Sequence, residues 1–148
     1  MTLAIAHRGD PIQFRENTLP AIRAAAAAGA DMVEIDLKLT SDAQVVLLHD
    51  ATMERLWGFS RPVTGLSLAE LAAFNGEADQ RVPTLLEVLA EFGRPHPLQF
   101  MLNVTSVDTA LATDAWCRSS VWPKRCSTPV RSRRYARSGR TVPAWSWR

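Results

Sequence analysis

The sequence predicts an α/β fold that opens with a strand, a helix and a second strand. Three observations support this order: an apolar run at 3–6, an alanine-rich segment at 21–28, and alternating apolar and acidic residues at 33–37. Thr18 is a typical N-cap for the helix, and Gly29 is a typical residue to end it. Such an order is that of a βαβ unit, in which the two strands run parallel.

The second predicted strand carries two acids, Glu34 and Asp36, which are two residues apart. Side chains at i and i+2 share one face of a strand, so both carboxylates should point the same way. Two unpaired carboxylates on one face repel each other and are costly to bury. A bound cation would remove this cost, and oxygen ligands suit Mg²⁺ or Ca²⁺.

A third apolar run at 45–48 ends at His49 and is predicted to return beside the acidic strand. The connection is too short for a parallel crossover, which needs roughly a dozen residues, so the return should be antiparallel. With residues 41–42 at the tip of the turn, His49 lies opposite Glu34. This hairpin would place an imidazole beside the two carboxylates.

The first strand ends at His7 and Arg8, which are followed by a glycine that permits close approach of a ligand. In parallel α/β units, ligands gather at the carboxyl ends of the strands. We therefore expect His7 and Arg8 to converge with Glu34, Asp36 and His49. Taken singly, a histidine such as His7 is more often a hydrogen-bonded core residue, and an arginine such as Arg8 is more often a surface charge.

The later part of the chain predicts two more helices and another core strand. The helices are expected at 68–74 and 85–92, and the strand at 98–104. Thr84 and Glu87 have the spacing of a capping box at the start of the second of these helices.

The length and composition of the chain limit the kinds of protein it can be. A chain of 148 residues with 47% hydrophobic and 22% charged residues is long enough for one ordinary globular domain. No apolar run approaches the ~20 residues of a membrane span. The first residues lack the apolar centre of a signal peptide, so a cytoplasmic protein is expected.

Charge divides the chain into two parts. Nine of the 17 basic residues, none of the 15 acidic residues and four of the five tryptophans lie in 115–148. We therefore predict a domain over 1–114 and a basic tail over 115–148, rich in tryptophan and arginine, that is non-native or disordered. A frameshift is the interpretation we favour, and the alternative is a genuine tail that binds nucleic acid or anionic lipid.

Several short motifs follow one another in a specific order. They are Ala6-His7-Arg8-Gly9, Glu16-Asn17-Thr18, Glu34-Ile35-Asp36, Thr40-Ser41-Asp42, His49-Asp50 and Pro83-Thr84-Leu85. A single pair of spaced acids would carry no weight, but the ordered set resembles the glycerophosphodiester phosphodiesterases. The resemblance covers roughly residues 3–103.

This resemblance implies a (β/α)8 TIM barrel of the phosphodiesterase type, truncated to about its first half, with a small insertion after the strand that bears His49. It implies a metal-dependent enzyme that hydrolyses a small glycerophosphodiester to an alcohol and glycerol 3-phosphate. His7 and His49 match the catalytic acid and base of the family, and Arg8 matches a phosphate contact. Glu34 and Asp36 match ligands of a divalent metal, expected to be Mg²⁺ or Ca²⁺. Nucleic acid is not an expected partner.

The chain departs from the family pattern at the third core strand. Thr105 stands where the family has a third carboxylate ligand, and Val107 where it has a lysine. Because a hydroxyl is a poorer ligand for a hard cation, metal affinity should fall. Three alternatives remain: an inactive pseudoenzyme of the same family, a phospholipase of the sphingomyelinase D type, and a module that binds through the basic tail. Half a barrel would also leave open sheet edges, which predicts poor solubility or an oligomer that covers them.

Overall fold

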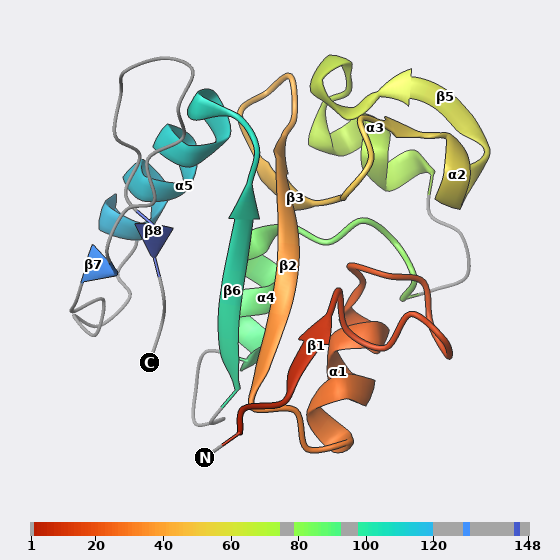
Figure 1. Cartoon of the computed structure of the whole chain (residues 1–148). Helices are drawn as coiled ribbons and strands as arrows, with labels where there is room; N and C mark the ends of the chain where they lie inside the picture. Colours follow the sequence, from red (N-terminus) through yellow and green to blue (C-terminus); the bar gives the residue numbers. More distant parts are fainter. Residues whose placement is uncertain (1, 75–78, 93–97, 120–128, 131–143, 146–148) are drawn as a thin grey trace.

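The computed structural model describes residues 2–74, 79–92, 98–119, 129–130 and 144–145, with side chains as far as Trp116. Its elements are β1 (Ile5–His7), α1 (Leu19–Ala27), β2 (Met32–Leu39), β3 (Val45–Leu47), β4 (Thr52–Met53), α2 (Glu54–Trp57), β5 (Phe59–Pro62), η1 (Val63–Gly65), α3 (Leu68–Ala73), α4 (Leu85–Phe92), β6 (Gln99–Val104), α5 (Val107–Ser119), β7 (Pro129–Val130) and β8 (Ala144–Trp145) (Figure 1).

Strand β2 is the centre of a four-stranded sheet (Figure 1). β1 runs parallel to the first half of β2 and places His7 beside Glu34. β3 runs antiparallel to the second half of β2. β6 runs parallel along the opposite edge and places Asn103 beside Asp36. The predicted βαβ unit and the third core strand are therefore confirmed.

Helix α1 begins where its cap predicts. The side-chain oxygen of Thr18 accepts a hydrogen bond from the backbone N–H of Ala21, which satisfies one of the free donors of the first turn. The helix starts at Leu19, directly after this cap, and Pro20 is well accommodated in its first turn. Beyond the helix, Gly29 adopts a φ of +85° that turns the chain into β2.

The hairpin between β2 and β3 is antiparallel, as predicted, but its predicted register is wrong. Leu37 pairs with Leu47, and the backbone N–H of Thr40 donates to Gln44 O at 3.0 Å. The tip therefore holds three residues rather than two, because Ala43 adopts a φ of 60° and adds a left-handed residue to the turn.

This shift of one residue changes what lies opposite the acids. β3 ends at Leu47, and the backbone N–H of Leu48 donates to Asp36 O at 3.0 Å. His49 consequently does not lie opposite Glu34, and the predicted pairing of these two residues is wrong. A register slip by one residue is sufficient to exchange the faces of every side chain in a strand.

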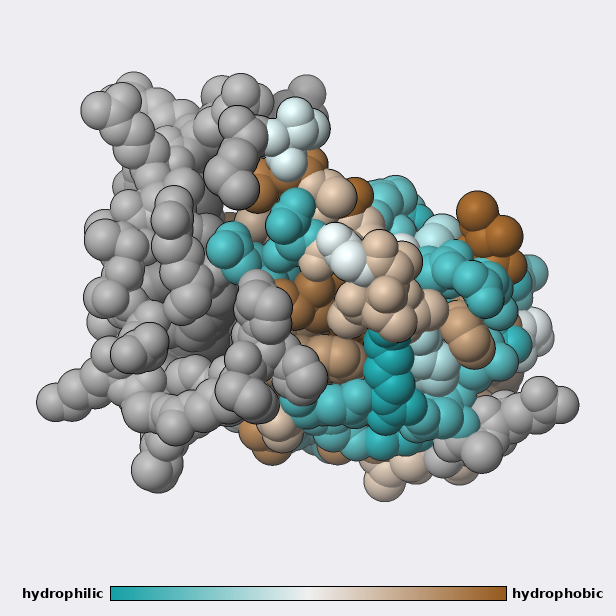
Figure 2. Space-filling model, turned by 90° about the horizontal axis from the view of Figure 1, so that it is seen from below, coloured by the Kyte–Doolittle hydropathy of each residue, from teal (hydrophilic) through white to brown (hydrophobic). Residues whose placement is uncertain are grey.

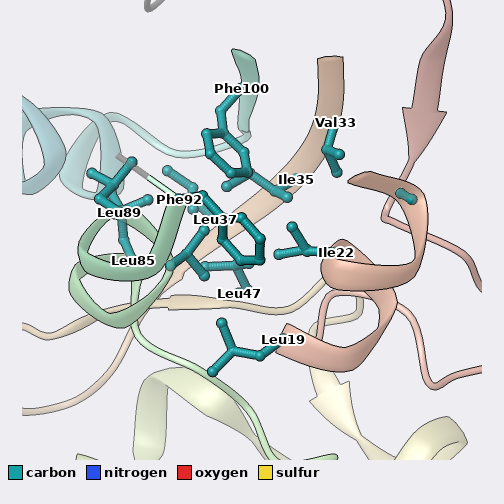
Figure 3. Close-up of a cluster of buried hydrophobic side chains, with 12 residues drawn as sticks. Leu19, Ile22, Val33, Ile35, Leu37, Leu47, Leu85, Leu89, Phe92 and Phe100 are labelled. Atoms are coloured by element: carbon teal, nitrogen blue, oxygen red, sulfur yellow. The ribbon is translucent and has the colours of Figure 1, made fainter. Parts of the chain in front are cut away.

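The main hydrophobic core lies between the sheet and helices α1 and α4 (Figure 3). β2 contributes Val33, Ile35 and Leu37, and β6 contributes Phe100, whose ring packs edge-on against Phe92 at a centroid distance of 6.1 Å. Since side chains alternate along a strand, the intervening residues of β2 face away from this core. The predicted common face of Glu34 and Asp36 follows from this alternation.

A small unit follows the strand that bears His49, where the resemblance implies an insertion. It comprises β4, α2, β5, η1 and α3, and it lies beside the main sheet (Figure 1). Its own core contains Met53, Val63 and Leu71. Helix α3 is fixed at its start by a capping box between Ser67 and Glu70.

The capping box of α4 is confirmed. The backbone N–H of Thr84 donates to Glu87 Oε2 at 2.8 Å, and the N–H of Glu87 donates back to Thr84 Oγ1 at 3.1 Å. Helix α5 runs across the predicted domain boundary at residue 115, and Trp116 packs against the main core. Apart from residues 115–119 and the short pair of β7 and β8, the predicted tail lies outside the described residues.

Figure 2 shows the end of the molecule from which β2 and β6 start, with apolar residues near the middle of its described part and polar residues around them. Among the described residues, no helix combines the length and hydropathy needed to cross a membrane.

Candidate active site

Four of the predicted residues meet where neighbouring strands run side by side. His7 ends β1, and its Nε2 lies 3.8 Å from Glu34 Oε2 on β2. Arg8 follows directly, and its Nε lies 2.9 Å from Asp36 Oδ2 in an ion pair that lacks hydrogen-bond geometry. The structure thus brings these four side chains close together.

The turn after β1 directs the Arg8 guanidinium back over the sheet. Arg8 has a φ of 62°, and its backbone N–H donates to Glu34 O at 2.9 Å. Gly9 has a φ of +88°, and a Cβ there would lie 2.6 Å from the carbonyl carbon of Ala21. A left-handed non-glycine residue is strained, and such strain gathers at functional sites.

Asp36 is held by two asparagine side chains that the sequence analysis did not propose as site residues. Asn17 Nδ2 donates to Asp36 Oδ2 at 3.0 Å, and Asn103 Nδ2 donates to Asp36 Oδ1 at 2.8 Å. These bonds compensate for the burial of a carboxylate that is only 3% exposed. Both asparagines stand in segments that the sequence singled out, but neither segment shows by itself which carboxylate its amide reaches.

Glu34 is the less satisfied of the two acids. Its Oε2 is buried without a hydrogen-bond partner. Burial raises the pKa of Glu34, and the negative charge of Asp36 raises it further, although His7 and Arg8 oppose both effects. A buried carboxylate oxygen without a partner is an available ligand for a cation.

The donor set for a metal is small. Among the described residues, no group of three or more histidine, cysteine, aspartate or glutamate side chains is placed to hold a metal ion. Glu34 and Asp36 offer two carboxylates, and Mg²⁺ is held in many proteins by one or two carboxylates together with water. The residues present therefore fit a hydrated divalent cation rather than a cation enclosed by protein ligands.

Lys38 brings a further positive charge to the same face of β2. Lys38 Nζ donates to Thr105 Oγ1 at 3.1 Å, just beyond the last pair of β2 and β6. The residue follows Asp36 by two positions, and that spacing was the signal in the sequence that could have identified it.

His49 lies in a separate group of charges. Its Nδ1 is 2.8 Å from Asp50 Oδ1, and it makes no hydrogen bond to Glu34 or Asp36 among the described side chains. Arg55 Nε donates to the other oxygen of Asp50 at 2.6 Å. The hydrogen bond from Arg55, with that of His49, holds the pKa of Asp50 below its usual value despite partial burial.

Glu16 joins this group to Arg8. Glu16 Oε1 accepts from Arg8 Nη1 at 3.0 Å and from Arg55 Nη2 at 2.5 Å. Burial by itself raises the pKa of Glu16, but the hydrogen bonds and charges of Arg55 and Arg8 outweigh burial and lower it. The arrangement thus presents two partly exposed imidazoles, a guanidinium and a pair of carboxylates, which are groups suited to an anionic substrate and to proton transfer.

The model of the glycerophosphoryl diester phosphodiesterase family matches residues 7–122. The chain belongs to this family. The chain is 37% identical over 110 residues to a glycerophosphodiester phosphodiesterase of Caldanaerobacter subterraneus, a match that covers 70% of this chain and 44% of that protein. It is 40% identical over 110 residues to glycerophosphodiester phosphodiesterase 1 of Mus musculus, covering 68% of this chain and 33% of the relative.

Solved structures of family members share the fold. A glycerophosphodiester phosphodiesterase of Thermotoga maritima superimposes with a TM-score of 0.66 at 29% identity, covering 80% of this chain and 49% of that one. A phosphodiesterase of Oleispira antarctica, solved with the product sn-glycerol-3-phosphate, gives a TM-score of 0.65 at 30% identity, covering 84% and 54%. The chain spans about half the length of these structures, and its fold is that of about half of a phosphodiesterase-type (β/α)8 barrel.

Proposed function

We propose that this protein hydrolyses glycerophosphodiesters to an alcohol and glycerol 3-phosphate. The observation that carries the proposal is the meeting of His7, Arg8, Glu34 and Asp36 at adjoining strands, in a chain of a phosphodiesterase family. A phosphodiester is an anion that resists attack, so its cleavage needs positive charge and proton transfer at one place.

Arg8 is the proposed contact for the phosphate. Its guanidinium is largely buried and is held between Glu16 and Asp36, which fixes its direction before a substrate arrives. A planar guanidinium has five N–H donors in a fixed fork and so can serve these carboxylates and a phosphate together. Lys38 supplies a second cation on the same face, at the Thr105 side of the site.

Glu34 and Asp36 are the proposed ligands of a divalent cation, Mg²⁺ or Ca²⁺. The unpartnered oxygen of Glu34 and its raised pKa support this role, because a cation would satisfy that oxygen. When bound, the cation would neutralise charge that develops on the phosphoryl oxygens.

His7 and His49 are the proposed acid and base. Since the Asp50 carboxylate can only accept a hydrogen bond when ionised, Nδ1 of His49 carries the proton and Nε2 is free to take or give one. His7 is exposed beside Glu34 and is therefore accessible to a substrate. Either a hydroxyl of the substrate or water could be the nucleophile that these groups serve.

The test is release of glycerol 3-phosphate from glycerophosphocholine by the purified full chain, with Mg²⁺, with Ca²⁺ and with EDTA. We expect activity that EDTA removes and that His7→Ala abolishes, while the exposed control variant Arg61→Met retains it. Release of choline from sphingomyelin or from lysophosphatidylcholine, without action on glycerophosphocholine, would identify a phospholipase of the sphingomyelinase D type instead. A chain that binds substrate but turns over neither class would be a pseudoenzyme.

A further inference from the structure

A continuous series of charged contacts joins the two ends of the site. It leads from Arg8 through Glu16, Arg55 and Asp50 to His49, with donor–acceptor distances of 3.0, 2.5, 2.6 and 2.8 Å. Arg55 is the one member that contacts both a carboxylate of the loop after β1 and the carboxylate beside His49. Removing it would divide the series into two parts.

We propose that Arg55 is a positioning residue for the reaction. It holds Asp50 so that this carboxylate fixes the orientation and the tautomer of the His49 imidazole. The inference rests on the proposed function, because it assigns His49 a part in proton transfer. It does not require that Arg55 touch the substrate.

The two carboxylate oxygens of Asp50 contact different side chains. Oδ1 lies 2.8 Å from His49 Nδ1, and Oδ2 accepts from Arg55 Nε at 2.6 Å. An oxygen anchored by a charged donor leaves the carboxylate little freedom to turn, so the other oxygen stays directed at the imidazole. A histidine whose Nδ1–H is held in this way presents the lone pair of Nε2 outward.

Arg55 is itself held in place from the other side. Its Nη1 and Nη2 reach the two oxygens of Glu16 at 3.3 and 2.5 Å, a two-point contact that fixes the plane of the guanidinium. A second contact ties α2 to the same loop, since the guanidinium carbon of Arg15 lies 5.1 Å from the ring centre of Trp57. The inserted unit after β3 is therefore anchored to the loop after β1, and through that loop to Arg8.

A purely structural role for Arg55 makes a different prediction from a positioning role. If Arg55 only fastened α2, its loss would lower stability and leave His49 unaffected. If Arg55 positions Asp50, its loss changes the state of the His49 ring and lowers kcat with little effect on KM. A misplacement of a catalytic group by about 1 Å can cost on the order of a hundredfold in rate.

The first measurement is long-range ¹H–¹⁵N NMR of the imidazole nitrogens in the full chain near neutral pH. The sequence contains three histidines, so His49 can be assigned with His49→Gln. We expect the Nδ1–H tautomer in the wild type, a mixture of tautomers in Arg55→Met and in Asp50→Asn, and recovery in Arg55→Lys. Arg61→Met, an exposed arginine of the same inserted unit, is the control and should match the wild type.

The second measurement is steady-state kinetics with glycerophosphocholine. We expect Arg55→Met to lower kcat roughly ten- to a hundredfold, as is typical for loss of a group that orients a functional side chain. Unchanged kcat and unchanged His49 nitrogens in Arg55→Met, relative to Arg61→Met, would overturn the proposal. An Nε2–H tautomer of His49 in the wild type would overturn it as well.

The two readouts separate this inference from the proposed function. If the wild type hydrolyses nothing but the His49 tautomer depends on Arg55, the proposed function is refuted and the orienting role of Arg55 toward Asp50 and His49 is supported. A wild type that is active, with an Arg55→Met variant equal to it in both measurements, supports the function and refutes Arg55 as a positioning residue.

Discussion

Asn17 and Asp36 exchange two hydrogen bonds across 19 residues of sequence: Asn17 Nδ2 donates to Asp36 Oδ2 at 3.0 Å, and the backbone N–H of Asp36 donates to Asn17 Oδ1 at 3.2 Å. Asn17 holds a φ of 56°, a left-handed conformation that asparagine tolerates better than most residues. One buried side chain thus satisfies both the carboxylate and the main chain of a proposed metal ligand.

Asn17→Ala should be strongly destabilising for this reason. It removes both bonds, leaves the buried backbone N–H of Asp36 without the acceptor that Asn17 supplies, and places alanine at a positive φ. We expect a loss of about 2–3 kcal/mol in the free energy of unfolding. Urea denaturation measures it, with Gln13→Ala, which removes an exposed bond to Asp10, as the control. Equal midpoints for the two variants would show that the exchange contributes little.

Glu34→Gln should stabilise the protein while abolishing catalysis. Burial raises the pKa of Glu34, so its charge opposes folding above that pKa, and protonation relieves the cost as the pH falls through it. In metal-free buffer the variant should therefore exceed the wild type by about 1 kcal/mol near pH 7, and this difference should shrink in acid. Thermal unfolding at several pH values measures it. A less stable variant at pH 7 would mean that the carboxylate is favourably solvated.

Glu87 should make stability depend on pH in the opposite sense. The hydrogen bond from Arg81 lowers the pKa of Glu87 from its usual 4.5 to about 2. The contribution of the Arg81–Glu87 pair is thus complete above pH 4.5 and is lost as the pH falls toward 2. Glu87→Gln should be less stable than the wild type near pH 7 and equal to it near pH 2. A constant difference across this range would assign the effect to helix capping alone.

Two glycines with nearly the same φ allow strain and steric contact to be separated. Gly9 and Gly29 have φ values of +88° and +85°, but a Cβ meets Ala21 at 2.6 Å in the first and nothing within 4 Å in the second. Gly29→Ala should cost about 1 kcal/mol from backbone strain. Gly9→Ala should cost several times more and also disturb the turn that aims Arg8. Equal costs by urea denaturation would contradict the close packing of this turn on α1.

Thr105→Glu should tighten the binding of Mg²⁺ by adding a carboxylate beside the proposed ligands. Lys38 Nζ lies 3.1 Å from Thr105 Oγ1, so the new carboxylate would first pair with that lysine. The gain should therefore be larger in Thr105→Glu combined with Lys38→Gln than in Thr105→Glu alone. Calorimetric titration measures the affinities, with Lys38→Gln as the control. Equal affinities in all four proteins would show that position 105 does not reach the cation.

Local chemistry made much of the fold predictable from the sequence. The cap at Thr18, the capping box of Thr84 and Glu87, and the alternation around Glu34 and Asp36 act within a few residues of chain, and each was found as predicted. Short-range signals of this kind depend on backbone geometry that every chain shares. They can therefore be recognised in the sequence without knowing which distant segment packs against them.

The tertiary structure decided what depends on distant segments or on an uncommon backbone conformation. Ala43 carries no side-chain signal for its left-handed φ, yet that one residue sets the hairpin register and removes His49 from its predicted place opposite Glu34. Asn103 reaches Asp36 across 67 residues, and Arg55 reaches Glu16 across 39, because packing of the strands and of the inserted unit brings them together. Side chains that meet only after packing leave no periodicity in the sequence, and so the asparagine partners of Asp36 and the arginine partners of Glu16 appeared only in the folded chain.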